Sequence, residues 1–139
     1  MNNTIALTTT PQPVPSEDAK AAEALMPGYL VTLNSAGDAV KHPTAGAAAA
    51  RTFALERDEM GKTIDTPYAV NDTVKVGTFA RGQRLLAWLP AGATVAVGDP
   101  LESAGNGLLR PVTTGVALVR ALQAVTNPAT AVRVRVEVL

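Results

Sequence analysis

A series of short β-like segments, interrupted by Gly, Pro, Asn and Asp about every 10 residues, most constrains what this chain can fold into. In the clearest segment, residues 132–138, valines point one way while two arginines and a glutamate point the other. That period of two is typical of a strand with one buried face. Similar segments occupy residues 29–33, 38–41, 52–57, 73–79, 84–89, 94–97 and 108–112. We therefore predict an all-β, single-domain fold: a jelly roll, a β-barrel or a β-sandwich.

The stretches between these segments predict two hairpins. Residues 34–37 (Asn-Ser-Ala-Gly) and 103–107 (Ser-Ala-Gly-Asn-Gly) are rich in residues that tolerate turn geometry. Residues 116–125 fit a helix or a strand, and the β pattern around them favours a strand. The alanines of residues 45–50 fit a helical turn or a packed surface loop equally well.

The first part of the chain differs from the rest. Residues 1–16 carry no charge and contain three prolines at alternate positions, which favour extended backbone. Such a segment is a loose tail or an arm that lies on a neighbour as an added strand; we favour an extended arm over residues 1–16, followed by one β-domain over residues 17–139. We also expect Ser16 to cap one short helix that Pro27 and Gly28 end. Removal of residues 1–16 should then leave a folded domain.

Composition excludes several kinds of chemistry. The chain has no cysteine, which removes disulfides, thiolate metal sites and thiol nucleophiles. Its twelve basic and twelve acidic residues balance to zero, which argues against nucleic acid as a direct partner. No secretory signal is expected, and no apolar stretch reaches the length of about 18 residues that spans a membrane. We therefore expect neither a membrane nor a nucleic acid as a partner.

Candidate catalytic groups are few. The only histidine, His42, lies in a Lys-His-Pro sequence, and none of the three serines lies in a nucleophile motif. Glu56, Asp58 and Glu59 form the densest acidic cluster, which suits glycoside hydrolysis or a hard cation, but basic residues interleave with it. A solvated strand end explains that cluster better. We predict no enzyme activity, no catalytic residue, no cofactor and no metal site.

A carrier module is one alternative. Residues 92–101 have the Gly-x-x-Val-x-x-Gly-Asp-x-Leu rhythm of lipoyl and biotinyl domains, which present a modifiable lysine in a turn. The nearest lysine here is Lys62, in a Met-Gly-Lys sequence that departs from both motifs. The rhythm therefore indicates a β-hairpin and leaves a binding or carrier module as a second hypothesis.

The order of several weak sequence pieces carries a family resemblance. These pieces are residues 27–31, 37–43, 53–61, 68–74, 95–101, 106–109, 115–122 and 132–138. In this order the chain resembles the small decoration, or cement, proteins of tailed-bacteriophage heads, and among them those of short-tailed Bordetella-type phages. The resemblance implies a compact jelly roll or β-barrel that forms homodimers or homotrimers. It also implies binding to the outer surface of a shell of major capsid protein with the HK97-type fold.

The resemblance implies a structural virion protein that stabilises the capsid by bridging its subunits and is made in the host bacterial cytoplasm. A phage tail or baseplate β-domain is an alternative. The family pattern assigns no individual residue. From the sequence itself we expect the capsid or oligomer interface to include apolar side chains of the arm, the single tryptophan and two arginines: Ile5, Leu7, Val14, Trp88, Arg133 and Arg135.

Overall fold

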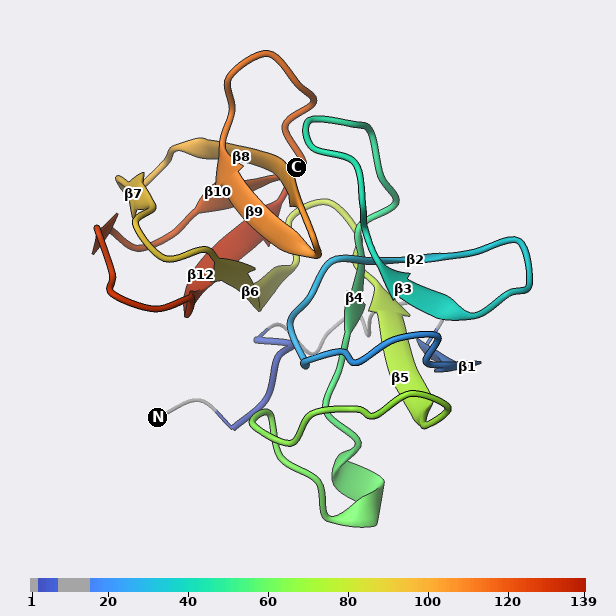
Figure 1. Cartoon of the computed structure of the whole chain (residues 1–139). Coiled ribbons are helices and arrows are strands. Elements are labelled where there is room, and N and C mark those ends of the chain that lie inside the picture. Colours follow the sequence, from blue (N-terminus) through green and yellow to red (C-terminus); the bar gives the residue numbers. More distant parts are fainter. Residues whose placement is uncertain (1–2, 8–15) are drawn as a thin grey trace.

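The largest sheet in the computed structural model, which describes residues 3–7 and 16–139, has five strands (Figure 1). Their order is β6 (Arg84–Leu89), β12 (Val132–Val138), β10 (Val119–Ala121), β8 (Pro100–Gly105) and β9 (Leu108–Pro111). Every neighbouring pair is antiparallel. The described residues contain no α-helix, so the all-β prediction is confirmed.

The strand with the clearest sequence pattern, β12, lies inside this sheet between β6 and β10. Its Val134, Val136 and Val138 are buried, whereas Arg135 on the opposite face is exposed. We call the apolar cluster beneath this sheet the major core. Its large buried side chains include Ile5, Leu30, Phe53, Leu85, Leu89, Leu101, Leu109 and Leu118. The predicted alternation of residues 132–138 is therefore confirmed from position 134 onward.

Residues 5–7 extend the five-stranded sheet beyond β6. Ala6 forms an antiparallel bridge with Leu85, and the Leu7 amide donates to the Arg84 carbonyl at 2.9 Å. The Leu86 amide donates to the Ile5 carbonyl at 2.9 Å. This part of the predicted arm therefore pairs with a sheet of its own domain, as an added edge strand.

A second group of strands encloses a smaller cluster, which we call the minor core. One sheet has the order β1 (Ser16–Lys20), β5 (Thr73–Thr78) and β4 (Thr52–Ala54), and β2 (Val31–Leu33) pairs with β3 (Ala39–Lys41). Isolated bridges join Leu30, next to β2, to Phe53 of β4, and Ala21, next to β1, to Ala39 of β3. Each edge of one sheet therefore contacts an edge of the other. The minor core consists of Ala21, Leu25, Val31, Ala39, Ala54, Tyr68, Val74 and Val76.

The remaining elements are short. β7 (Thr94–Val95) pairs with β11 (Val125–Thr126), and a 3-10 turn covers Asp58–Met60. Residues 116–125, which fitted a helix or a strand, contain β10 and the start of β11. Residues 45–50 form a loop without regular secondary structure.

The helix expected after Ser16 is wrong. Residues 16–20 instead form β1, which pairs antiparallel with β5; Asp18 lies opposite Lys75 and Ala19 opposite Val74. A helix of about two turns is marginal alone. Pairing with β5 and burial of Ala21 and Leu25 in the minor core outweigh the helix propensity of the alanines.

Both predicted hairpins are confirmed. Between β2 and β3, the Asn34 side-chain oxygen accepts from the amides of Ala36 and Asp38, each at 2.9 Å. Between β8 and β9, residues 105–107 all have positive φ. Gly-Asn-Gly satisfies that requirement because glycine, and to a lesser degree asparagine, tolerates left-handed backbone.

Candidate interaction surface

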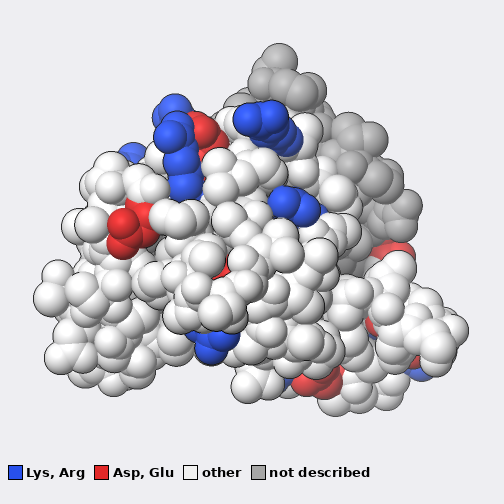
Figure 2. Space-filling model, turned by 90° about the horizontal axis from the view of Figure 1, so that it is seen from above, with Lys and Arg blue, Asp and Glu red and all other residues white. Residues whose placement is uncertain are grey.

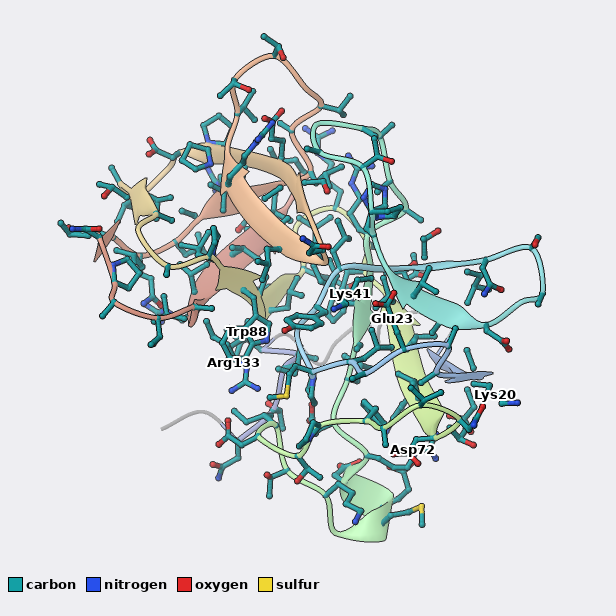
Figure 3. The ribbon with its side chains drawn as sticks, in the orientation of Figure 1. Lys20, Glu23, Lys41, Asp72, Trp88 and Arg133 are labelled. Carbon is teal, nitrogen blue, oxygen red and sulfur yellow. The ribbon has the colours of Figure 1, made fainter. Side chains whose placement is uncertain are left out.

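Two of the predicted interface residues, Trp88 and Arg133, contact each other inside the domain (Figure 3). The Arg133 guanidinium lies 4.5 Å from the centre of the Trp88 ring, a cation–π geometry. It also donates to the Asp65 carboxylate at 2.8 Å and to the Ile64 carbonyl. The Trp88 indole N–H donates to the Pro27 carbonyl at 2.8 Å. Both side chains therefore hold two loops against the outer face of the five-stranded sheet.

Ile5, another predicted interface residue, has no exposed area and lies in the major core. Its amide donates to the buried carboxylate of Glu56 at 3.0 Å. Removal of residues 1–16 would thus remove a core side chain, so we now expect that truncation to destabilise the domain. Val14 lies outside the described residues.

Leu7 and Arg135 come together at one hollow. The hollow is about 400 Å³ in volume and is lined by Leu7, Arg84, Leu122 and Arg135. We call it the arginine hollow. Arg84 and Leu122 did not stand out in the sequence, although the antiparallel pairing of residues 84–89 with residues 132–138 would place Arg84 beside this face.

Ion pairs surround the arginine hollow. Glu137 accepts from Arg84 at 3.3 Å and from Arg120 at 2.8 Å, so one carboxylate serves two guanidinium groups. The Arg135 amide donates to the Gln123 side chain, and its carbonyl accepts from the Leu122 amide. Figure 2 shows one face of the molecule, on which several blue groups lie toward the top and most of the other described residues are uncharged.

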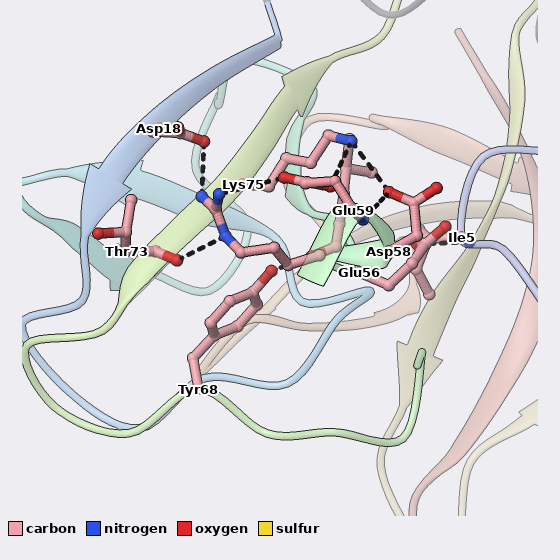
Figure 4. A network of polar contacts seen from close by, with 10 residues as sticks. Ile5, Asp18, Glu56, Asp58, Glu59, Tyr68, Thr73 and Lys75 are labelled. Atoms are coloured by element: carbon pink, nitrogen blue, oxygen red, sulfur yellow. Dashed lines mark hydrogen bonds and ion pairs between the residues drawn. The ribbon is translucent and has the colours of Figure 1, made fainter. Parts of the chain in front are cut away.

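A second polar network lies beside the minor core (Figure 4). Arg57 donates to Asp18 at 2.6 Å, to Glu59 at 3.1 Å and to the Thr73 carbonyl at 3.1 Å. Burial disfavours the charged guanidinium, but Asp18 and Glu59 outweigh it and raise the pKa of Arg57. The network ties β1, β5 and the loop after β4 together.

The acidic cluster singled out in the sequence belongs to this network. Lys75 lies 3.4 Å from both Asp58 and Glu59, and a hydrogen bond with Glu59 together with Lys75 lowers the pKa of Asp58. Burial alone would lower the pKa of Lys75, yet the two carboxylates raise it. Glu56 instead accepts from Ile5. The three carboxylates are thus engaged by groups of the same chain.

A hollow of about 540 Å³ adjoins this network. Its lining includes Asp18, Arg57, Met60, Lys62 and Asp72. Carboxylates and cations both face it, so it selects no single charge. Lys62 follows the 3-10 turn, and its amide donates to the Arg57 carbonyl at 3.1 Å.

The structure brings His42 and Ser103 together. The His42 Nδ1 lies 3.0 Å from the Ser103 hydroxyl, and both residues are buried. Burial lowers the pKa of His42. The same hydroxyl accepts from the Gly105 amide at 3.2 Å, and neither residue lines the two hollows described above. This pair joins the segment after β3 to β8.

Within residues 3–7 and 16–139, no group of three or more His, Cys, Asp or Glu residues is arranged to hold a metal ion. None of the helical segments there has the length and apolar character needed to cross a membrane.

Comparison with solved structures gives a likeness in fold. No protein-family model and no curated protein matches the chain. Among solved structures, its fold is similar to that of the N base of head fiber gp8.5 in bacteriophage phi29, with a TM-score of 0.57 and 16% sequence identity. The match covers 89% of this chain and 92% of that chain. The two chains therefore share an all-β fold over nearly their whole lengths.

Proposed function

We propose that this chain is a structural protein of a phage virion that binds the outer surface of the capsid and stabilises the shell by bridging major capsid protein subunits. The observation that carries this proposal is the fold likeness to a phage head fiber base, which spans nearly all of both chains. The Bordetella-type resemblance and the homodimer or homotrimer state remain predictions.

The chemistry of the surface supports a binding role. A net charge of zero and a largely uncharged face suit contact with protein better than contact with nucleic acid. The candidate acidic and histidine groups are engaged within the domain. A small domain bound at many equivalent sites on a lattice gains avidity from repetition, so each contact can be modest.

Of the predicted interface residues, Leu7 and Arg135 suit contact with a partner best. They lie at the arginine hollow, where Arg135 is exposed. Ile5, Trp88 and Arg133 act inside the domain. We therefore propose that the capsid contact includes Leu7 and Arg135, together with Val14.

The test is co-sedimentation of the purified protein with expanded shells of the cognate major capsid protein. We expect saturable binding at a copy number that matches one class of symmetry position, and shells that resist heat better when coated. Light scattering of the free protein measures its oligomeric state. Absence of binding to well-formed shells would contradict the proposed function.

A further inference from the structure

Within the described residues, Arg135 of β12 is an arginine without a carboxylate partner. Five arginines each lie within 3.3 Å of a carboxylate oxygen: Arg57, Arg84, Arg110, Arg120 and Arg133. Arg135 is exposed, and within the described part of the chain its guanidinium has no carboxylate partner. Glu137, the nearest acidic residue along β12, is already shared by Arg84 and Arg120.

The register of the sheet places Arg135 near a second arginine, Arg84. Arg135 lies opposite Leu86, and Arg84 lies opposite Glu137 in the same β6–β12 register. Arg84 and Arg135 are therefore diagonal neighbours, within reach of each other across the strands. Both line the arginine hollow, so two guanidinium groups face one concave surface of about 400 Å³.

The rest of the lining is apolar. Leu7 and Leu122, both partly buried, complete the hollow beside the two arginines. An apolar wall lowers the local dielectric and strengthens a charge-assisted hydrogen bond made within it. The hollow thus combines a positive potential with a surface that accepts methylene groups.

We propose that the arginine hollow binds a glutamate or aspartate side chain on an apolar segment of a partner protein. Arg135 forms the principal ion pair with that carboxylate, Arg84 adds to the positive potential, and the two leucines contact the aliphatic neighbours of the acidic residue. This inference rests on the proposed function for the identity of the partner, the capsid protein, but the binding chemistry itself does not.

A carboxylate fits this hollow better than a phosphate backbone. A nucleic-acid site needs a row of cations that follows successive phosphates, often with aromatic side chains for the bases. Here the two arginines lie beside leucines, and Glu137 lies next to them. Arginine binds a single carboxylate with two parallel hydrogen bonds, which suits one acidic side chain.

The test uses the whole chain and short peptides. A blocked peptide of sequence Leu-Glu-Leu-Asp is titrated into labelled protein, and the backbone amide signals are followed by NMR. We expect shifts at Leu7, Arg84, Leu122 and Arg135, with affinity that falls as salt rises. Arg135→Glu should weaken binding at least about tenfold. The matched variant Lys62→Glu has the same change in charge at another exposed site and should bind as the wild type does.

Three results would overturn the inference. They are equal binding of the amide peptide Leu-Gln-Leu-Asn, full binding by Arg135→Glu, and tighter binding of a short oligothymidylate at the same residues.

Shell co-sedimentation of the same variants separates the two proposals. If the wild type binds the acidic peptide but no shell, the proposed function fails and the carboxylate site stands. If Arg135→Glu binds shells normally, the hollow does not contact the capsid.

Discussion

The major and minor cores are stabilised by different means. The major core is filled by large side chains, among them Phe53, Leu85 and Leu101, all fully buried. The minor core contains three alanines and three valines among its eight buried residues, and its one large aromatic, Tyr68, donates its hydroxyl to the Leu55 carbonyl at 2.6 Å. Beside it lies the network of Arg57 and Lys75. The first region depends on large apolar side chains, whereas the second combines small buried side chains with polar links.

Strand β4 separates the two regions. Because successive strand residues point to opposite faces, Phe53 enters the major core and its neighbour Ala54 enters the minor core. Adjacent positions therefore belong to environments of different size. Substitutions on this one strand can test the comparison directly.

The largest effect is expected from Phe53→Ala. The variant leaves a cavity in the major core and removes the edge-to-face contact with Phe79, whose ring centre lies 5.9 Å away. We expect a loss of about 3–5 kcal/mol in the free energy of unfolding, measured in urea. Val70→Ala, at an exposed site, is the control and should change the free energy little. A loss below about 1 kcal/mol for Phe53→Ala would show that the major core does not depend on volume.

A substitution from a small to a large side chain is expected to destabilise the minor core. Ala54→Leu adds three carbons to a residue with no exposed area in the minor core. We expect a loss of about 1–3 kcal/mol from overpacking, again measured in urea. Ala54→Gly is a useful companion because it adds no volume. If Ala54→Leu instead stabilised the protein, the minor core would contain unfilled space.

A smaller effect should follow from Arg57→Met, which keeps the aliphatic stem and removes the guanidinium from the minor-core network. The Arg57 side chain is only 12% exposed, so its ion pairs are less screened than ordinary surface pairs. We expect a loss of about 1 kcal/mol at low salt and a smaller loss in high salt. Lys62→Met is the matched control. Equal losses in the two variants would show that the network contributes no stability of its own.

The smallest effect concerns pH. Burial lowers the pKa of His42 in the folded state below its value of 6.5 in the unfolded chain, so the unfolded chain binds the proton more readily. Stability is then fully present above pH 6.5 and falls as the pH decreases below it. His42→Gln should remove this slope between pH 6.5 and 5.5, where no other side chain of the chain ordinarily titrates. An unchanged slope in the variant would assign the pH dependence to another group.

Much of the strand pattern was readable from the sequence because it is local. The alternation of residues 132–138 and the Asn-Ser-Ala-Gly turn each depend on a few neighbouring residues. The sequence predicts a helix in place of β1 because its pairing partner, β5, lies more than 50 residues further along the chain. That pairing, together with the burial of Ala21 and Leu25, outweighs the local helix signal. The division into two cores likewise depends on distant contacts.

The candidate site shows the same limit. Leu7 and Arg135 were singled out separately, and only the fold brings them to one hollow. Arg133 has the same sequence context as Arg135, yet it reaches Asp65, 68 residues away, while Arg135 is left exposed. Period-two patterning predicts that both face outward, but which one meets a loop depends on the path of residues 62–67.

The short strand formed by residues 5–7 has a consequence for aggregation. β6 is the edge of its sheet and reads Arg-Leu-Leu-Ala-Trp-Leu, an apolar sequence with high β propensity and little charge. An uncovered edge of this kind is a template on which a second copy can pair and fibres can grow. With Ala6 bridged to Leu85, part of that template is occupied by the chain's own backbone. The pairing of residues 5–7 thus protects part of this edge against association with a second copy.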